Sequence, residues 1–498
     1  MNKLCVLDAD TMRKADEGTI EELGIGQEVL MERAALAVVK HIRKEQARRI
    51  LCVCGTGNNG GDAVAVARIL CMQGMQADVY MCGNPDKYKP AVKKQLEIFR
   101  KINGRTVTDR NFTEYDMIVD GIFGIGTERF VEGEYAQVIN AVNEAHEKGT
   151  IVISVDIPSG IHTDTGRILS TAVKADQTVT FAYYKPGHLL YPGAEYCGKT
   201  MVEDIGISYQ YFFDANNTFT VGKKEKIDLP KRRRDGNKGT FGRVLVIAGS
   251  KSMYGACYLS ALATLRMGVG LVDIYTHEVN RASIQTMLPE AILHVYGDDG
   301  FDKEILNELI KQADCVLMGP GISVDDIAMD TVRFVLENCE KSLIVDADAL
   351  NCIAKNKDLL YNQNRFANRE IIITPHPGEL SRLTGESIAQ LKENYIHIIE
   401  AFAKQYRLIV VGKDAGTVVS DGCNVYLNQT GNEGMATAGS GDVLSGIIAG
   451  LCAQGEAGFD AAWKGVYLHG RAGDYALEQS NSYSLIAGDI ANALTQII

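Results

Sequence analysis

A glycine-rich run with one carboxylate, TAGSGDVLSG at residues 437–446, has the composition of an anion-binding turn. Gly439, Ser440 and Gly441 stand just before an apolar helical pattern, so their backbone N–H groups would converge at the positive end of the helix dipole. Asp442 falls in the first turn of that helix, where a carboxylate can take the proton of a hydroxyl that receives a phosphoryl group. The alternative is an ordinary helix N-cap, although capping alone does not require the flanking glycines.

Other predicted strand ends in the same half of the chain suit a nucleotide site. Lys413 lies in a polar turn between two apolar runs, a natural place for phosphate or ribose contacts. The GPGIS turn at 319–323 exposes its backbone, and His376 stands between two prolines that restrict it, in either a structural or a functional role. The acidic strand end VDADALN at 345–351 either holds a magnesium phosphate or only caps the next helix.

The first half of the chain carries three polar strand ends of a different kind. GTGNNGGD at 55–62 follows an apolar run and opens a helical pattern, but it matches neither the P-loop nor the dinucleotide-binding fingerprint. Its glycines let a ligand approach the backbone closely. VDGIFGIG at 119–126 and VDIPSG at 155–160 end two further apolar runs. A glycine-rich turn capped by Asp62 is the alternative interpretation of the first stretch.

These strand ends are predicted to bring Asn59, Asp120, Asp156 and Ser159 toward one crevice, since ligands of open α/β sheets sit at the carboxyl ends of the strands. Surroundings rich in oxygen and poor in histidine favour a hard cation over zinc. Two carboxylates on separate strands also allow one to bind an ion while the other moves a proton.

The elements that must position these residues form two α/β blocks. Short apolar runs alternate with helical patterns, which is typical of a parallel sheet covered by helices on both faces. The expected strands are 49–55, 77–83, 116–124, 150–160 and 177–187 in the first block, and 242–250, 270–276, 314–323, 342–350, 370–380 and 407–416 in the second. The polar stretch 209–240 between the blocks is predicted to be a linker, and its KRRR run at 231–234 to be solvated rather than an anion patch.

Length and composition limit the classes of protein that fit. A chain of 498 residues is too long for one core and predicts two or three domains. A net charge of −12 argues against nucleic acid as a partner, and twelve scattered cysteines without metal-ligand spacing suit a reducing compartment. No apolar stretch approaches the roughly 20 residues that span a bilayer, and no signal peptide is visible. We therefore expect a cytoplasmic protein with no membrane partner.

The stretches NNGGD, D-G-x-F-G-x-G and DIPSG, in this order, resemble the N-terminal domain of the NAD(P)H-hydrate repair enzymes over about residues 1–215. The resemblance implies a Rossmann-like three-layer sandwich that epimerises the R and S hydrates of NADH and NADPH at C6. It implies a K⁺ ion held by Asn59, Asp120 and Ser159, and we assign the proton-moving base to Asp156. The family's contacts to the hydrated nucleotide fall on Asn58, Asn59, Gly60, Gly61, Asp62, Gly124, Ile125, Gly126, Thr127, Glu128, Arg129, Phe130, Tyr135 and Asp156. Ala63 stands where the family often has a further glycine.

The set GS…YGA, GPG, DADALN, TPHPGE, GK…GT and GSGD resembles the C-terminal dehydratase domain of the same enzymes, of the ribokinase-like superfamily, over about residues 225–498. This implies a second doubly wound three-layer sandwich, which dehydrates the S hydrate to NAD(P)H with Mg²⁺ and ADP, or ATP, and releases phosphate and AMP. The hydrate would contact Ala256, Gly321, His376 and the catalytic Asp442. The adenine nucleotide would contact Lys413, Asp414, Ala415, Gly416, Thr417, Asn432, Glu433, Gly434, Met435, Ala436, Thr437, Ala438, Gly439, Ser440 and Gly441. Asp414 and Asn237 depart from the family pattern.

Two other functions remain open from the residues alone. An anion hole followed by Asp442 also suits a small-molecule kinase, such as a vitamin-precursor kinase, fused to a nucleotide-binding or scaffold domain. The first block could instead be a non-catalytic nucleotide sensor, although a scaffold has no need of a carboxylate in its crevice. The expected partners are the hydrated dinucleotides, ADP and further copies of the same chain.

Overall fold

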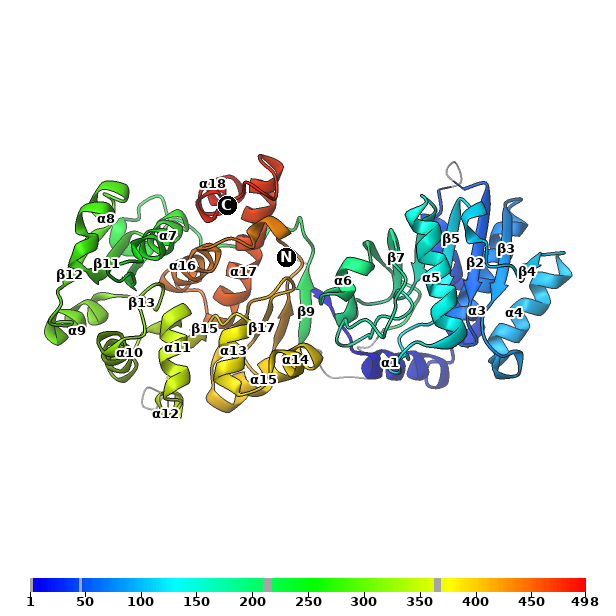
Figure 1. Ribbon diagram of the computed structural model, residues 1–498, viewed down its shortest axis with the longest axis horizontal. Coiled ribbons are helices and arrows are strands. Elements are labelled where there is room, and N and C mark those ends of the chain that lie inside the picture. The colour runs from blue at the N-terminus through cyan, green and yellow to red at the C-terminus, as the bar shows by residue number, and fades with distance from the viewer. Residues whose placement is uncertain (1–2, 44–46, 209–216, 362–368) are drawn as a thin grey trace. The chain divides into compact units, whose positions relative to one another are not determined.

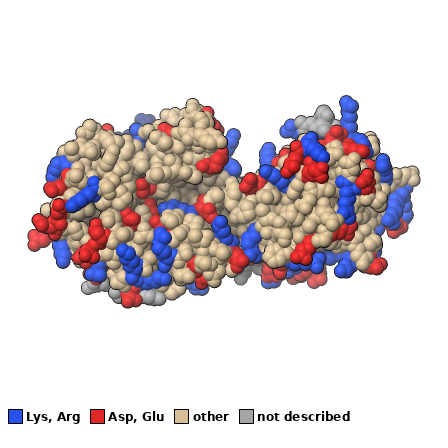
Figure 2. Space-filling model, in the orientation of Figure 1, with Lys and Arg blue, Asp and Glu red and all other residues tan. Residues whose placement is uncertain are grey.

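The computed structural model describes residues 3–43, 47–208, 217–361 and 369–498, and the chain divides into two compact units. The smaller unit comprises Leu4–Thr218, and the larger comprises Phe219–Ile498 with the first three residues (Figure 1). Acidic and basic side chains are interspersed over the visible face of each unit (Figure 2). Among the helices that the structure describes, none is long and apolar enough to cross a membrane.

A seven-stranded sheet forms the centre of the smaller unit, with the strand order β4-β3-β2-β5-β6-β7-β8 and parallel pairing throughout. The strands are β2 (Arg49–Cys54), β3 (Gln76–Met81), β4 (Thr106–Val107), β5 (Met117–Gly121), β6 (Ile151–Val155), β7 (Gln177–Phe181) and β8 (Lys199–Glu203). The helices are α1 (Ala9–Glu21), α2 (Gln27–His41), α3 (Asn58–Met72), α4 (Pro90–Lys101), α5 (Gly133–Glu147) and α6 (Gly193–Tyr196).

Alternation along β2 shows why this sheet has helices on both faces. Cys52 and Cys54 belong to one buried cluster with residues of α2 and α3, whereas Leu51 and Val53 belong to another with residues of α5. Successive side chains of a strand point to opposite faces, so a strand that is apolar at every position needs a cover on each side. The result is a three-layer sandwich.

The larger unit contains an eleven-stranded sheet in the order β1-β9-β18-β17-β16-β15-β14-β13-β10-β11-β12. Its strands are β1 (Lys3–Cys5), β9 (Thr218–Val221), β10 (Arg243–Ile247), β11 (Leu271–His277), β12 (Ile292–Tyr296), β13 (Cys315–Met318), β14 (Ser342–Val345), β15 (Ile371–Ile373), β16 (Ile409–Gly412), β17 (Val418–Ser420) and β18 (Val425–Leu427). The strands from β12 to β16 pair in parallel, and β16, β17 and β18 form an antiparallel meander.

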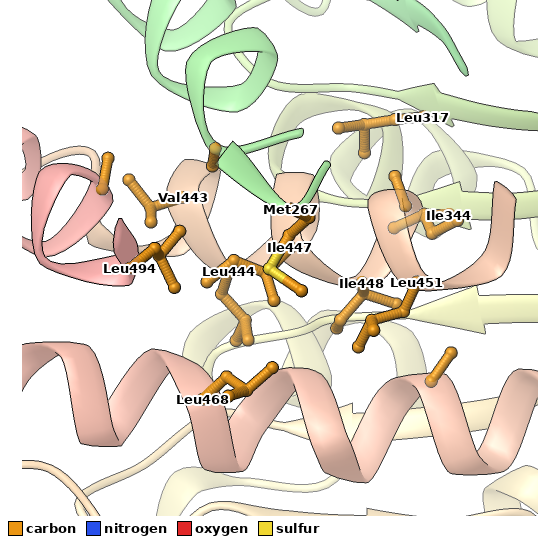
Figure 3. Close-up of a cluster of buried hydrophobic side chains, with 14 of the residues drawn as sticks. Met267, Leu317, Ile344, Val443, Leu444, Ile447, Ile448, Leu451, Leu468 and Leu494 are labelled. Atoms are coloured by element: carbon orange, nitrogen blue, oxygen red, sulfur yellow. The ribbon is translucent and has the colours of Figure 1, made fainter. Parts of the chain in front are cut away.

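Helix α16 (Ser440–Ala453) packs on the middle of this sheet and is buried almost all round. Its side chains Val443, Ile447 and Leu451 lie among Leu317 of β13 and Ile344 of β14 (Figure 3). The other helices are α7 (Tyr254–Arg266), α8 (Arg281–Met287), α9 (Lys303–Gln312), α10 (Asp326–Asn338), α11 (Ala347–Lys355), α12 (Asp358–Tyr361), α13 (Pro377–Thr384), α14 (Ile388–Glu393), α15 (Tyr395–Tyr406), α17 (Gly458–Glu478) and α18 (Ala487–Ile497). The core of the larger unit thus forms directly behind the GSGD turn.

These two sheets confirm the predicted fold class, and each apolar run predicted as a strand contains one. The predicted linker at 209–240 is partly wrong. Residues 209–216 lie outside the described residues, but Thr218–Val221 is a sheet strand with three fully or nearly buried positions. Its residues TFTV have the β-branched and aromatic composition of a strand, a signal that the surrounding polar residues obscured.

Candidate active sites

The NNGGD turn packs its helix tightly onto the end of a strand in the smaller unit. Helix α3 begins at Asn58, immediately after β2. A Cβ atom at Gly60 would lie 2.0 Å from the Gly55 carbonyl oxygen, so only glycine permits this approach. The close packing places the first turn of α3, with Asn59, at the carboxyl edge of the sheet.

A buried cluster of oxygen atoms surrounds Asp120 at this edge. Its carboxylate accepts hydrogen bonds from the Ser159 hydroxyl (2.6 Å) and backbone N–H (2.9 Å), the Ser154 hydroxyl (2.9 Å) and the Ile122 N–H (3.2 Å). Asp120 is fully buried, and this burial raises the pKa of its carboxyl although the hydrogen bonds oppose the change.

Asn59 completes the cluster from the side of α3. Its Nδ2 donates to the carbonyl oxygens of Phe123 (2.7 Å) and Val155 (3.0 Å), while the Ser159 hydroxyl oxygen accepts from the Phe123 N–H (2.8 Å). The structure therefore brings the three predicted metal residues, Asn59, Asp120 and Ser159, into one set of carboxylate, hydroxyl, carboxamide and carbonyl groups.

Asp156 directly follows Val155, whose carbonyl oxygen accepts from Asn59, and it has a buried cation as its partner. Its Oδ1 accepts from Lys185 Nζ at 2.6 Å and from the Thr180 hydroxyl at 2.9 Å. Burial acts to raise the pKa of Asp156, but the Lys185 ammonium more than offsets it and holds that pKa below its ordinary value. Asp156 also has a positive φ of 66°, which turns the chain sharply after β6.

His188 fixes the backbone of Asp156 in this turn. Its Nδ1 accepts from the Lys185 N–H (3.0 Å), so its Nε2–H donates to the Asp156 carbonyl oxygen (2.8 Å). Burial and the nearby Lys185 ammonium lower the pKa of His188 to about 4, which keeps the ring neutral. Sequence reasoning missed both Lys185 and His188, although the KPGH run at 185–188, where the expected strand 177–187 ends, was the available signal.

Some of the remaining residues predicted for this site lie near the oxygen cluster, and others do not. Gly124 lies over Asn59, and the Tyr135 ring packs on Phe123 with 4.8 Å between centroids. Burial and the nearby Asp156 raise the pKa of Asp62 well above its ordinary value, and the Asn58 Oδ1 is buried without a hydrogen-bond partner. Phe130, at the far end of the loop 124–130, is 70% exposed and is not brought to the cluster.

In the larger unit, the GSGD turn forms the N-terminus of α16 as predicted. Gly439 has a φ of +88° and a Cβ there would lie 2.3 Å from Leu259 of α7, so the turn requires glycine. A Cβ at Gly441 would lie 3.1 Å from Lys413 Nζ, which places the predicted turn 413–417, between β16 and β17, against the segment 432–441. The two stretches predicted to hold the nucleotide therefore adjoin each other.

Lys413, which is partly buried, makes an ion pair with the buried Asp346 at the end of β14. Its Nζ donates to Asp346 Oδ1 at 2.8 Å, and the same oxygen accepts from the Ala347 N–H and so caps α11. Burial would lower the pKa of Lys413, but the Asp346 carboxylate raises it overall. The second oxygen, Asp346 Oδ2, is buried and has no hydrogen-bond partner. Asp346 therefore caps a helix and also leaves one oxygen for a ligand.

The carboxyl of Asp442, near this ion pair, has a raised pKa. Burial, followed by the negative charge of Asp346, raises the pKa of Asp442 to about 7, while Lys413 acts in the opposite direction. Burial likewise raises the pKa of Glu379 to about 7. A carboxyl group with such a pKa can exchange a proton near neutral pH, as a general base requires.

The other predicted substrate residues lie at the ends of β10, β13 and β15. Gly321 has a φ of +65°, and a Cβ there would lie 3.0 Å from Met253 and 3.1 Å from Ala256. His376 is the N-cap of α13. Its ring Nδ1 accepts from the Gly378 N–H (3.0 Å), and its backbone N–H donates to the Glu379 carboxylate (2.8 Å). His376 thus has a structural role, while half of its side chain stays exposed.

Sequence reasoning missed two groups here. Glu379 was quoted within TPHPGE but given no role, and His469 was not considered. Ser440 Oγ lies 3.2 Å from His469 Nε2, and burial lowers the pKa of this histidine to about 4. No local pattern in α17 singles out His469, because its importance depends on how α17 packs against α16.

Two family models match the chain. One described as NAD(P)H-hydrate dehydratase matches residues 244–496, and one described as YjeF-related protein N-terminus matches residues 27–187. A bifunctional NAD(P)H-hydrate repair enzyme Nnr of Moorella thermoacetica is 37% identical, covering 99% of this chain and 96% of the relative. An Escherichia coli protein of the same name is 32% identical, covering 98% and 93%. A Bacillus subtilis ADP/ATP-dependent NAD(P)H-hydrate dehydratase structure, co-crystallised with ATP/Mg²⁺, is 31% identical with a TM-score of 0.48, covering 54% of this chain and 93% of that chain.

Proposed function

The chain belongs to the bifunctional NAD(P)H-hydrate repair enzymes, and from this premise we propose that its smaller unit is the epimerase and its larger unit the dehydratase. The observation that supports the second assignment best is Asp442, a carboxyl with a pKa of about 7 at the N-terminus of α16. The kinase alternative is not favoured, because the family model over residues 244–496 is described as a dehydratase.

In the dehydratase, Asp442 accepts the proton of the C6 hydroxyl of the S hydrate. The hydroxyl oxygen then forms a bond to the terminal phosphorus of ADP, and AMP leaves. Loss of a C5 proton and of the C6 phosphate restores the C5–C6 double bond, so the products are NAD(P)H, phosphate and AMP. The backbone N–H groups of Gly439 to Gly441 hold the transferring phosphoryl group, with the dipole of α16 adding to the attraction.

The two sides of Asp442 receive the two substrates. Lys413 to Thr417 and Asn432 to Gly441 contact the adenine nucleotide, and Ala256, Gly321 and His376 contact the hydrate. The unpartnered Asp346 Oδ2 would hold a Mg²⁺ ion, which would supply positive charge for the phosphoryl transfer, since Mg²⁺ in proteins is commonly bound by one or two carboxylates. Within the described ranges, no group of three His, Cys, Asp or Glu side chains is arranged to hold a metal ion.

In the epimerase, Asp156 removes the C6 hydroxyl proton of the hydrate. The C6–N1 bond then opens to an aldehyde while N1 takes this proton from Asp156. Attack of N1 on the other face of the carbonyl closes the ring and returns the proton through Asp156 to the oxygen, which gives the opposite epimer. Lys185 keeps the Asp156 carboxylate ionised and oriented. Residues 58–62, the loop 124–130 and Tyr135 contact the nucleotide.

The oxygen cluster in this unit fits K⁺. Asn59, Asp120 and Ser159 would hold the ion, and the cluster's oxygen-rich composition is the kind that hard cations prefer. When bound, K⁺ would supply positive charge at the carboxyl edge of the sheet, where Asp120 carries the negative charge.

An absorbance assay at the reduced-nicotinamide band tests both assignments. The full chain is incubated with a mixture of R and S NADH hydrates, Mg²⁺, K⁺ and either ADP or ATP, and then again with Na⁺ in place of K⁺. We expect complete recovery of NADH with ADP in the presence of K⁺. Recovery that stops when the S hydrate is consumed would contradict the epimerase assignment, and a stable phosphorylated product would restore the kinase alternative. Association of copies of the chain and its cytoplasmic location stay predictions, the first to be checked by light scattering.

A further inference from the structure

A cavity of about 280 Å³ in the larger unit has no part in the mechanism above. Residues from four strand ends line it: Ser250 and Met253 after β10, His277 at the end of β11, Tyr296 and Asp298 at the end of β12, and Ser323 and Asp325 after β13. Aromatic rings, hydroxyls and carboxylates thus meet in one hollow.

This cavity continues directly from the proposed substrate site. Met253 belongs to its wall and also packs against Gly321, where a Cβ would lie 3.0 Å from the Met253 Cβ. Ile322 and Ser323, the next two residues after Gly321, are wall residues too. A molecule that contacts Gly321 with one end can therefore reach the cavity with the other.

Strand order places the cavity away from the proposed nucleotide site. The cavity is built on β12, β11, β10 and β13, whereas the nucleotide residues follow β16 and β18. β14 and β15 lie between the two groups and carry Asp346 and His376 at their ends. With strands spaced at about 4.8 Å, the two regions flank Asp442 from opposite sides. ADP bound near Lys413 thus leaves the cavity to the other substrate.

The chemistry of the cavity suits a nucleoside better than a phosphate. Tyr296 and His277 present aromatic rings, with 5.5 Å between their centroids. His277 Nδ1 accepts from the Val279 N–H, so its Nε2–H donates to Asp298 (3.0 Å) and fixes this carboxylate at the rim. Lys251 pairs with the same carboxylate at 2.6 Å. Asp298 and Lys251 neutralise each other, and Asp325 is the remaining carboxylate among the lining residues. Asp325 Oδ1 caps α10 by accepting from the Ala328 N–H at 2.9 Å.

We propose that this cavity receives the adenosine end of the hydrated dinucleotide. We further propose that the dehydratase prefers NADH hydrate to NADPH hydrate because Asp325 is negatively charged and Asp298 neutralises Lys251, the ammonium that would otherwise attract a 2′-phosphate. Carboxylates accept hydrogen bonds from ribose hydroxyls and repel a 2′-phosphate, the means by which many dinucleotide sites select NAD over NADP. The inference rests on the dehydratase function proposed for this unit.

The test compares kcat/KM of the full chain for three S hydrates: those of NADH, of NADPH and of reduced nicotinamide mononucleotide, which lacks the adenosine end. The variants are Asp298→Asn and, as a matched control, Asp299→Asn, an exposed neighbour that does not line the cavity. We expect the wild-type protein to favour NADH hydrate over NADPH hydrate by about tenfold, or about 1.4 kcal/mol, which is within the range for one pair of like charges near a protein surface. Asp298→Asn frees Lys251 and should reduce this ratio about fivefold, with no change on the mononucleotide.

Four results would overturn the inference, three of which concern the preference between the two dinucleotide hydrates. These three are equal use of both dinucleotide hydrates by the wild-type protein, an unchanged ratio in Asp298→Asn, and a ratio that falls as far in Asp299→Asn. An equal effect of Asp298→Asn on the mononucleotide would overturn it as well, because the change would then act on the reacting end. If none of the three hydrates gave a reduced nucleotide, the dehydratase function itself would be refuted.

Discussion

Lys413 and Asp346 join the ends of two strands that are not neighbours: β16 and β14 are separated by β15, and the 2.8 Å ion pair spans its carboxyl end. The pair sets the charge around Asp442, because Asp346 raises the pKa of that carboxyl and Lys413 lowers it. Together with burial, which is the main cause, these two charges give the carboxyl of Asp442 a pKa of about 7.

Asp442→Asn should abolish dehydration and leave epimerisation intact. The amide cannot accept the hydroxyl proton, and loss of a general base costs about a hundredfold to ten-thousandfold in rate. NADH recovery from S hydrate measures the first activity, and conversion between R and S hydrates on a chiral column measures the second. Normal dehydration by this variant would exclude Asp442 as the base.

The two activities should respond differently to acid. A base with a pKa of about 7 is about nine-tenths protonated at pH 6, so kcat/KM for dehydration should fall about tenfold between pH 8 and pH 6. The pKa of Asp156 is instead held below its ordinary value, so it stays ionised over the same range and epimerisation should not lose its base. Parallel acid limbs in both profiles would contradict at least one of the two assignments.

Lys185→Met should destabilise the smaller unit, because it leaves the buried Asp156 carboxylate without its cation. Removing one member of a buried ion pair leaves an uncompensated charge and costs about 3 kcal/mol in the free energy of unfolding, as urea denaturation of the full chain would measure. Without the ammonium the pKa of Asp156 should rise, giving epimerisation an acid limb that the wild-type protein lacks.

The double variant Lys185→Met/Asp156→Asn provides the control. It removes both charges, so it should recover most of the lost stability but none of the epimerase activity. A double variant as unstable as the single one would mean that Lys185 stabilises the unit through its contacts with Thr180 and Phe181 rather than through Asp156.

Gly446→Ala should inactivate the dehydratase from within the core. A Cβ at Gly446 would lie 2.3 Å from the Ser260 carbonyl oxygen of α7, and the Thr264 hydroxyl donates to the Gly446 carbonyl oxygen across the same contact. Separating the two helices should cost about 3 kcal/mol and displace the turn that carries Asp442. Gly488→Ala, in α18, has no atom within 4 Å of its Cβ and should be neutral or slightly stabilising. Thermal unfolding and both activity assays distinguish the two variants.

Much of each candidate site could be predicted because its residues lie at the ends of apolar strands. Asn59, Asp120 and Ser159 come from three separate stretches, yet their strands β2, β5 and β6 are neighbours in one parallel sheet. The GSGD turn was likewise recognisable from local composition, because its glycines come directly before an apolar helical pattern. The structure shows why glycine is needed there: Gly439 has a φ of +88°.

The sequence by itself determined the two α/β domains, the strand ends that carry the chemistry and, through family motifs, the reaction class, because these depend on local pattern and order along the chain. Tertiary structure alone decided which charged and polar side chains pair with one another. Lys185 became the partner of Asp156, Asp346 that of Lys413, and His469 a neighbour of Ser440, through packing between elements distant in the sequence. Burial also decided acidity: Asp156 and Asp442 are the same residue type, but a buried cation lowers the pKa of the first, whereas desolvation and a nearby carboxylate raise that of the second.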